Sequence, residues 1–539
     1  LNYDLPVINR LLGLSISHTL TIDTLVISRL LNYDVEGGHS LEAWGQRLGY
    51  PKGDFNDWSK LSNEMIGYCQ RDVELTYLIY KKFERYINEE RWHKALRTEH
   101  DIVVICSEMH KNGFYFDIDR ANDLHKEISL ELERLDAFIK TGFPDRVVPV
   151  GTTIIKYTRQ GVPHANCRRL EPNGLGVGEV HTDFAAGAEV TVIDFEPFNP
   201  ASPKQIVQRL NQAGWKPVEK TKGHIKAERD LKQCRDPKER EKLKERLVEY
   251  AEFGWKVSEE NLETLPDDAP ESAKSLARRI LLASRLSSLN EWIRACEHDH
   301  RVHGTIHSIG AWTQRMSHDK PNTANIPSEF NRKGQVSPYG KEFRSLWTVP
   351  KGRRLVGTDA EGIQLRILAH YINDNVFTHS LISGDKDLGT DIHTMNKKAL
   401  GEPCKTRGVA KTFIYSWLLG AGEAKTAEVL SCSLPVAREA RQNFLNFYPG
   451  LKHLKEKQIP RDAKRGFFEG IDGRYVACDS EHLMLAGYLQ NGEAIVMKMA
   501  NILWRERLLK EKIPFWQVNF VHDEWQTETV DDDEIASFI

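Results

Sequence analysis

The sequence lacks several features that mark common classes of protein. No apolar run among its 539 residues is long enough to span a bilayer, and none has the pattern of a secretory signal. Its eight cysteines include no Cys-x-x-Cys pair, which argues against a zinc ribbon or a disulfide scaffold and suits a reducing compartment. The formal net charge is only −3, so no general excess of positive charge indicates a nucleic-acid partner. Because grooves are charged locally, this near-neutrality is only a weak argument against DNA binding.

The length and composition predict a globular chain of two to four domains. Hydrophobic residues make up 40% and charged residues 28%, as in ordinary globular proteins. The chain begins at Leu1 inside a strand-like segment and stops at Ile539, shortly after a helix-like start. We therefore expect a fragment that is truncated at both ends.

Periodicity divides the chain into segments of different character. Residues 1–95 alternate short apolar runs with amphipathic stretches and predict an α/β domain, and a long amphipathic helix is expected between 96 and 140. Residues 141–198 are rich in Gly, Pro and Thr and predict a loop-rich insertion with short β-like runs. Residues 216–247 hold twelve Lys and Arg against seven Asp and Glu. They predict a helical hairpin, which is either simply solvated or lies on a phosphate backbone.

The chemistry concentrates after residue 300, and its first segment is RRLVGTDAEGIQLRILAHY. Asp359 falls at the end of a probable strand, and a helix is expected to start near Glu361. A carboxylate at a strand end is held rigidly and stays accessible, as a Mg²⁺ ligand must be. On its own, an Asp at this place is more often a helix cap.

The second segment, DIHTMNKKALGEPCKTRGVAKTFIYSWLLGAG, carries cations on one helix face. Arg407, Lys411 and Tyr415 are spaced at i, i+4 and i+8, so the two cations lie about 6 Å apart along the axis. That spacing matches adjacent phosphates of a triphosphate, for which His393 adds a donor. Alone, the segment would indicate no more than a solvated basic face.

The third segment, QVNFVHDEWQTET, predicts two strands that meet at a tight turn. The turn holds His522, Asp523 and Glu524. Neighbouring carboxylates repel each other unless water or metal stabilises them, so a polar hairpin tip and a metal site are both compatible with the turn. Combined with the two earlier segments, it favours nucleotidyl transfer, with Asp359 and Asp523 bridging two Mg²⁺ ions.

In that order, the three segments resemble motifs A, B and C of family A DNA polymerases. The resemblance extends to TQRMSHDKPNTANIP, to GIDGRYVACDSEH with LQNGEAIVMK, and to NPASPKQIVQRLNQAGW, so it covers nearly the whole chain. KTFIY…GAG and HSLEAWGQRLGY are similar to polymerases of short-tailed phages. The resemblance implies an α/β and α+β multidomain fold, in which a partial RNase H-like 3′–5′ exonuclease domain precedes a right-hand polymerase.

The implied domains follow the chain in order. They are the end of the exonuclease domain at 1–95, a thumb at 96–299 with the insertion at 141–198, a first palm part at 300–374, fingers at 375–465 and a second, truncated palm part at 466–539.

The resemblance also implies roles for individual residues. Asp359 and Asp523 would be the metal-binding catalytic carboxylates, assisted by Glu524. The incoming dNTP would be held by His393, Arg407, Lys411, Tyr415 and Gln364. Arg315, Gln490 and His522 would contact the primer-template in the minor groove, where every base pair presents an acceptor.

Two positions depart from the family pattern. The family usually has Glu where Gln364 stands and Tyr where Leu419 stands, and these side chains pair beside the sugar pocket, where the Glu acts as a steric gate against ribonucleotides. Here Gln364 keeps the bulk without the charge, and Leu419 has no hydroxyl. We expect polymerase activity to survive.

At the N-terminal end, Asp4 and the pair Tyr68 and Asp72 resemble the second and third exonuclease motifs. The spacing of Tyr68 and Asp72 places phenol and carboxylate on one helix face, which is also compatible with an ordinary surface pair. The first motif, an Asp-x-Glu pair, is missing, so we expect this chain to proofread little or not at all.

The sequence is compatible with two other functions and with one partner. A single-subunit phage-type RNA polymerase usually has His-Asp-Ser where residues 522–524 read His-Asp-Glu, and a catalytically inactive DNA-binding module would not need paired carboxylates. The insertion at 141–198 lies where a processivity factor could bind. A phage origin implies that the enzyme works in the cytoplasm of a bacterial host.

Overall fold

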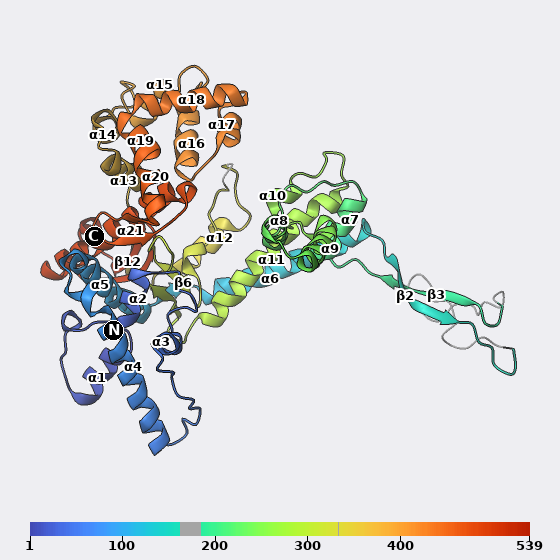
Figure 1. Ribbon diagram of the computed structural model, residues 1–539, viewed down its shortest axis with the longest axis horizontal. Coiled ribbons are helices and arrows are strands. Elements are labelled where there is room, and N and C mark those ends of the chain that lie inside the picture. Colours follow the sequence, from blue (N-terminus) through green and yellow to red (C-terminus); the bar gives the residue numbers. More distant parts are fainter. Residues whose placement is uncertain (162–184, 332–333) are drawn as a thin grey trace. The chain divides into compact units, whose positions relative to one another are not determined.

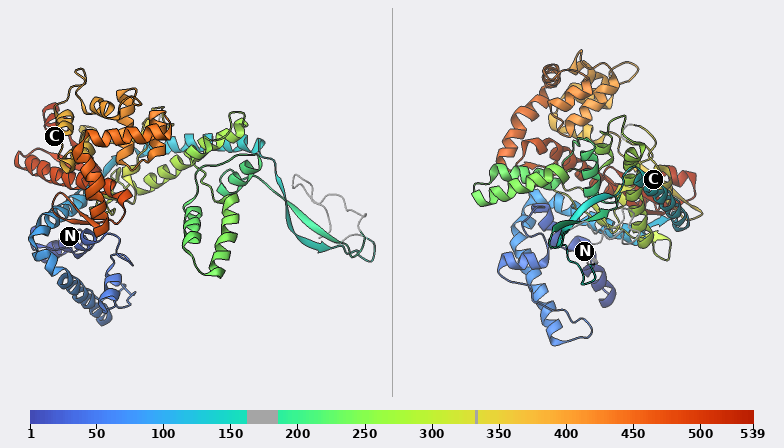
Figure 2. Two further views of the ribbon diagram at one scale, coloured as in Figure 1. Left: turned by 45° about the horizontal axis from the view of Figure 1, so that its top comes forward. Right: turned by 90° about the vertical axis from the view of Figure 1, so that its right-hand side faces the viewer.

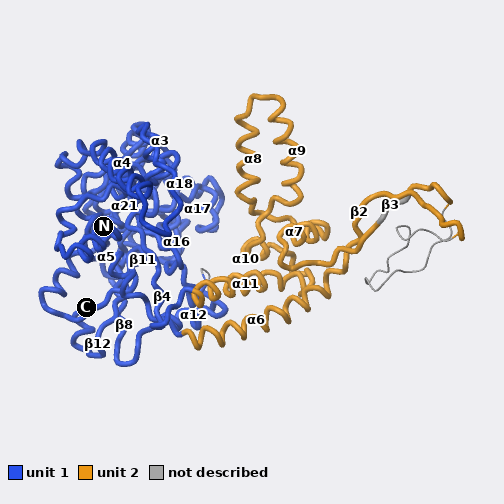
Figure 3. The backbone as a smooth tube through the Cα atoms, turned by 90° about the horizontal axis from the view of Figure 1, so that it is seen from below, with its two compact units in different colours: residues 1–117, 295–539 blue, residues 118–294 orange. Residues whose placement is uncertain are grey.

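The computed structural model describes residues 1–161, 185–331 and 334–539. The chain divides into two compact units, which are coloured separately in Figure 3. Unit 1 comprises residues 1–117 and 295–539, and unit 2 comprises residues 118–294. No described helix is both long enough and apolar enough to cross a membrane.

The first part of unit 1 is helical, so the expected α/β arrangement of residues 1–95 is wrong. All of these residues are described, and no strand lies among them. The elements are α1 (Asp4–Leu12), η1 (His18–Leu20), α2 (Thr24–Leu31), α3 (Leu41–Leu48), α4 (Asn63–Asn88) and α5 (Glu90–Asn112). Figure 1 shows α1 to α5 in blue.

The β-branched residues at the start of α2 favour a strand when taken alone, but they form a helix. The Asp23 carboxylate accepts hydrogen bonds from the backbone N–H groups of Leu25 and Val26 and so caps a helix instead. Ile27 and Leu30, one turn apart, are almost fully buried in a cluster with side chains of α4 and α5. Tertiary packing therefore outweighs local strand propensity here.

The single helix expected between 96 and 140 is also wrong. It is interrupted at Gly113, whose φ of +62° ends α5. A Cβ at this glycine would lie 2.6 Å from the ring of His303, so a side chain does not fit. Strand β1 (Phe114–Phe116) follows, and α6 (Ile118–Thr141) begins after it.

The largest sheet of unit 1 has three antiparallel strands in the order β11–β12–β8. They are β8 (Arg353–Asp359), β11 (Phe515–Val521) and β12 (Glu524–Val530), as the sequence predicts. Helix α5 lies against this sheet, and its Asn112 side chain donates to the Gln517 carbonyl at 2.8 Å. Shorter strands form three further sheets: β4 (Arg301–Val302) and β7 (Trp347–Thr348) with β1, β5 (Thr305–His307) with β6 (Ser317–Asp319), and β9 (Phe467–Glu469) with β10 (Tyr475–Ala477).

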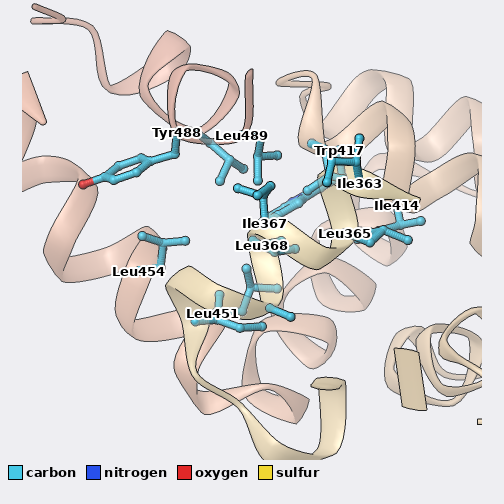
Figure 4. Close-up of a cluster of buried hydrophobic side chains, with 14 of the residues drawn as sticks. Ile363, Leu365, Ile367, Leu368, Ile414, Trp417, Leu451, Leu454, Tyr488 and Leu489 are labelled. Atoms are coloured by element: carbon cyan, nitrogen blue, oxygen red, sulfur yellow. The ribbon is translucent and has the colours of Figure 1, made fainter. Parts of the chain in front are cut away.

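The remaining described elements of unit 1 are helices, and most of them contribute to one apolar core. They are η3 (Thr323–Asn325), α12 (Gly340–Ser345), α13 (Ile363–Ile372), α14 (Asn375–Ile382), α15 (Ile392–Leu400), α16 (Arg407–Leu418), α17 (Glu423–Leu430), α18 (Leu434–Phe447), α19 (Pro449–His453), the π-helix η4 (Leu454–Gln458), α20 (Ile459–Arg465), α21 (Glu481–Lys510) and α22 (Asp533–Phe538). Figure 4 shows side chains of α13, α16, α19, η4 and α21 in this core. The core fixes α13 and α21, which border the candidate site.

The described residues of unit 2 form α6, a β-hairpin and five further helices. The hairpin pairs β2 (Arg146–Ile154) with β3 (Glu189–Glu196), side by side in Figures 1 and 2. The helices are α7 (Pro203–Gln212), α8 (Lys222–Gln233), α9 (Pro237–Phe253), α10 (Glu259–Leu262) and α11 (Glu271–Ala295). The hairpin belongs to the segment that was expected to be a loop-rich insertion, of which residues 162–184 lie outside the described residues.

The charge-dense segment forms the helical hairpin that the sequence predicts. Helices α8 and α9 lie side by side in Figure 3 and contact each other. Asp236 caps α9 by accepting from the N–H groups of Lys238 and Glu239. Most of the cationic side chains on both helices are exposed, which leaves them accessible to an anionic partner.

Candidate active site

The carboxylates of the candidate site meet at one end of the β11–β12–β8 sheet. Asp359 is the last residue of β8 and pairs in register with Glu524, the first residue of β12. The N–H of Ala360 donates to the carbonyl oxygen of Asp523 at 3.0 Å. Asp359 and Asp523, far apart in sequence, are therefore neighbours in the structure.

The site is electrostatically strained by its own negative charge. Partial burial raises the pKa of Asp359 above its usual value, and the charges of Asp523 and Glu524 raise it further. A divalent cation between Asp359 and Asp523 would relieve that repulsion, and both side chains offer the carboxylate oxygens that Mg²⁺ prefers. Among the residues that the structure describes, no group of three or more His, Cys, Asp and Glu could hold a metal ion. A metal bound here would thus take further oxygen ligands from water or from phosphate.

A cavity of about 260 Å³ opens on the same sheet and reaches the Glu524 side chain. Asn519, Gln526 and Arg344 also line it. The amide of Gln526 donates to Glu524 at 2.5 Å, which fixes the carboxylate at the edge of the cavity. Glu524 can therefore act beside a ligand from a defined position.

The cationic helix is α16, and it presents the expected residues. Thr406 caps the helix by accepting from the N–H of Val409, and Arg407 is its first residue. Lys411 is exposed and has no ion-pair partner in residues 1–161, 185–331 and 334–539. Tyr415, one turn after Lys411, lies with its ring centre 6.1 Å from that of His393.

Arg407 is held in place by Asp391. Its Nη2 lies 2.9 Å from an Asp391 carboxylate oxygen. Burial alone would raise the pKa of Asp391, but hydrogen bonds from Arg407 and Thr394 lower it to about 2. Burial and the Arg407 charge lower the pKa of His393, whose buried Nδ1 has no hydrogen-bond partner in the described parts of the chain. A neutral His393 can accept or donate a hydrogen bond.

Two further predicted residues, Arg315 and Gln364, meet at a carboxylate that the sequence did not single out. Glu493, on α21, accepts a hydrogen bond from Arg315 at 2.5 Å and another from Gln364 at 3.1 Å. Burial and the Arg315 charge lower the pKa of His522, while Glu493 and Asp523 oppose that shift. Gln490 lies one turn before Glu493 on the same helix and is partly buried.

The backbone beside Arg315 is anchored by a buried charge cluster. Arg474 donates to the Gln314 side chain at 2.7 Å, and Lys498 donates to the Gln314 carbonyl at 2.9 Å. Both cations also bind the Glu99 carboxylate, at 2.7 and 2.8 Å, and none of these three charged side chains is more than 1% exposed. The cluster therefore fixes the chain next to a predicted primer-template contact.

The predicted exonuclease residues are only partly brought together. Tyr68 and Asp72 lie on one face of α4, where Lys52 approaches both of them, 3.2 Å from the Asp72 carboxylate and 5.0 Å from the centre of the Tyr68 ring. Asp4 is exposed in the first turn of α1. No ion pair or hydrogen bond links Asp4 to Tyr68 or Asp72, all three of which are described.

Comparison with known proteins gives the family of this chain. The family model described as "DNA polymerase family A" matches residues 182–538. The chain belongs to DNA polymerase family A. It is thus a DNA polymerase by family, with the mixed helix and sheet architecture of that family.

Relatives of this family A chain include phage and bacterial enzymes. It is 26% identical to a DNA-directed DNA polymerase of Enterobacteria phage T3 over 631 residues, which covers 97% of this chain and 84% of the relative. The DNA-directed DNA polymerase of Escherichia phage T7 is equally similar, at 26% over 632 residues with the same coverage. DNA polymerase I of Chloroflexus aurantiacus is 25% identical over 300 residues, or 52% of this chain and 30% of that protein.

A solved structure shares the fold of this polymerase. The polymerase domain of Pol1 from M. smegmatis, in complex with DNA primer-template and dNTP, superposes with a TM-score of 0.66 at 15% sequence identity. The match covers 96% of this chain and 77% of that one.

Proposed function

We propose that this family A polymerase extends a primer 3′ end with dNTPs on a DNA template, by two-metal nucleotidyl transfer, during replication of a phage genome in its bacterial host. The observation that carries the proposal is the meeting of Asp359, Asp523 and Glu524 at one sheet end, with a raised pKa at Asp359. These negative charges would repel the phosphates of DNA and so weaken simple DNA binding, whereas a reaction that needs a cation beside phosphates requires them.

In this proposal Asp359 and Asp523 would hold two Mg²⁺ ions, and Glu524 would support them from the start of β12. When bound, the ions would activate the primer 3′-hydroxyl and neutralise the charge of the triphosphate. Arg407 and Lys411 bind phosphate oxygens from α16, the first as a planar fork and the second as a point charge. His393 adds a hydrogen bond, and Tyr415 lies against the nucleotide's sugar and base.

Arg315, Gln490 and His522 would contact the primer-template near its terminus. The burial of Arg315 against Glu493 and the anchoring of Gln314 support a contact that checks base-pair geometry from one fixed position. The exposed cations of α8 and α9 would add sequence-independent affinity through counterion release. We also propose that a processivity factor binds the segment 141–198, which contains the β2–β3 hairpin.

We also propose that this chain proofreads weakly or not at all. The Asp72 carboxylate, which would hold an exonuclease metal, is neutralised by Lys52 at 3.2 Å. Incubating the chain with Mg²⁺ and a 5′-labelled single strand should leave the strand intact. Steady, metal-dependent shortening from the 3′ end would refute this part of the proposal.

Primer extension tests the main proposal. The chain is incubated with Mg²⁺, a labelled primer-template and either dNTPs or NTPs. Template-directed extension with dNTPs, and little with NTPs, is the expected result. Preferred use of NTPs would identify an RNA polymerase instead, and binding without extension would identify an inactive DNA-binding module.

A further inference from the structure

Glu493 is an unusual residue for its surroundings. It lies in α21 between Gly492 and Ala494, is 1% exposed, and belongs to a stretch in which nearly every side chain is buried. A buried carboxylate costs several kcal/mol in solvation unless its partners replace the lost water. Its position therefore calls for a function that justifies the cost.

The partners of Glu493 are residues of the candidate site. One carboxylate oxygen, Oε2, accepts from Nη2 of Arg315 at 2.5 Å and from Nε2 of Gln364 at 3.1 Å. The other oxygen, Oε1, is buried and has no hydrogen-bond partner within the described ranges. Glu493 thus ties the start of α13 to the segment that carries Arg315.

The hydrogen bond between Glu493 and Gln364 bears on positions 364 and 419, the two that depart from the family pattern. Position 364 carries no charge, and Leu419, at the other altered position, is 64% exposed and offers no hydroxyl. A glutamine has three rotatable bonds, so without a partner it could swing away from an extra hydroxyl group. A charge-assisted hydrogen bond to its amide removes that freedom. Because Nε2 of Gln364 donates to Glu493, the amide is held in one orientation.

We infer that Glu493 is a positioning residue for sugar selection: it supplies from α21 the carboxylate that position 364 lacks, and it holds Gln364 and Arg315 in place. The inference rests on the proposed function, since it assigns Gln364 to the nucleotide's sugar. Glu493 contacts neither nucleotide nor primer in this account. It acts through the two side chains that it binds.

The test compares dNTP with rNTP incorporation in four variants. The readout is the ratio of kcat/KM for a dNTP to kcat/KM for the matching rNTP, measured on one primer-template with Mg²⁺. Glu493→Gln should lower this ratio about tenfold, because a neutral acceptor replaces a charged one. Gln364→Glu places two carboxylates within hydrogen-bond distance and should lower dNTP incorporation, with recovery toward lower pH as one of them is protonated.

The double variant Gln364→Glu with Glu493→Gln exchanges the two side chains. It keeps one charge, one amide and the contact between them, so its ratio should return to within about threefold of the wild-type ratio. A residue that only stabilises the fold would not produce this recovery. If Glu493→Gln does not fold, the double variant and Gln364→Glu alone decide the question, and equal ratios in those two overturn the inference.

Glu528 provides the matched control. It is also buried, at 2% exposure, and it binds Arg301 at 2.9 Å. It lies on the same β12 strand, four residues from Glu524 and so about 13 Å along the sheet from the carboxylate site. Glu528→Gln should lower the melting temperature and leave the sugar ratio unchanged.

The experiment distinguishes a failure of the proposed function from a failure of the inference about Glu493. If the wild-type chain does not extend a primer with dNTPs at all, the proposed function falls, and the role of Glu493 falls with it. If the wild-type chain extends normally and Glu493→Gln keeps the wild-type ratio within twofold, only the inference about Glu493 is overturned.

Discussion

Removing the Glu99 carboxylate should destabilise unit 1 severely. Glu99 is fully buried and binds Arg474 at 2.7 Å and Lys498 at 2.8 Å. Asp472 is the other carboxylate of this cluster, so Glu99→Gln leaves one buried positive charge without compensation. Breaking a buried ion pair in this way costs roughly 3–5 kcal/mol.

The expected change in melting temperature follows from the size of the unit. Unit 1 has roughly 360 residues, and unfolding gains about 2.1 cal/mol/K for each of them, so the loss lowers Tm by about 4 to 7 °C. Burial lowers the pKa of Lys498, and Glu99 opposes that shift. In the variant the Lys498 ammonium can therefore lose its proton as the pH rises. The difference in Tm between Glu99→Gln and the wild type should then become smaller toward alkaline pH.

Thermal unfolding followed by circular dichroism measures this effect at pH 6, 7.5 and 9. Glu506→Gln is the control, because Glu506 is exposed on the same helix as Lys498, and its loss should change stability by no more than about 0.5 kcal/mol. A Glu99→Gln protein that melts within about 1 °C of the wild type at every pH would refute the reasoning about the buried cluster.

Three further predictions concern the cations. Arg407→Ala and Lys411→Ala should each raise the KM for dNTP by about 10- to 100-fold, with a much smaller effect on primer-template affinity; equal effects on both would contradict their assignment to the triphosphate. The pKa of Asp391 is depressed to about 2, so the stability that its pairing with Arg407 provides is complete above about pH 4 and is lost as the pH falls toward about 2. In Asp391→Asn the free energy of unfolding should therefore depend less on pH in that window. An unchanged pH dependence would contradict this prediction. Replacing Lys226 and Lys232 together by Gln should reduce the slope of log binding constant against log salt by about 1.8, and an unaltered slope would exclude α8 from the DNA contact.

The helices and strands that carry the candidate site were largely predictable from the sequence, because each of them follows from a local pattern of residues. Apolar residues on both sides of His522, Asp523 and Glu524 predicted two strands and a turn, and the structure has them as β11 and β12. The spacing of Arg407, Lys411 and Tyr415 predicted one helix face, which α16 provides. Periodicity and spacing fix such elements without knowledge of distant contacts.

The errors arose where distant packing decides the local structure. The β-branched start of α2 has strand propensity, but a cap at Asp23 and burial against α4 and α5 make it helical. Gly113 ends α5 with a φ of +62°, and a side chain there would collide with His303, which lies far along the chain. Neither packing partner is visible in a local window of sequence.

Glu493 was missed for a related reason. A single Glu in a helix is usually solvated, and nothing in its spacing links it to Gln364 or Arg315. The available signal was its apolar neighbourhood, LQNGEAIVMK, taken together with the missing carboxylate at position 364. Only the fold shows that the two positions are in contact.

The central claim is that Asp359 and Asp523 work together on one metal-dependent reaction. The most direct test is the single-turnover rate of dNTP incorporation by the wild-type chain, by Asp359→Asn and by Asp523→Asn, on the same primer-template with Mg²⁺. Loss of a metal-binding carboxylate removes several kcal/mol of transition-state stabilisation, so each variant should be slower by about 10³-fold or more while still binding DNA. A variant that incorporates dNTP within tenfold of the wild-type rate would contradict the claim.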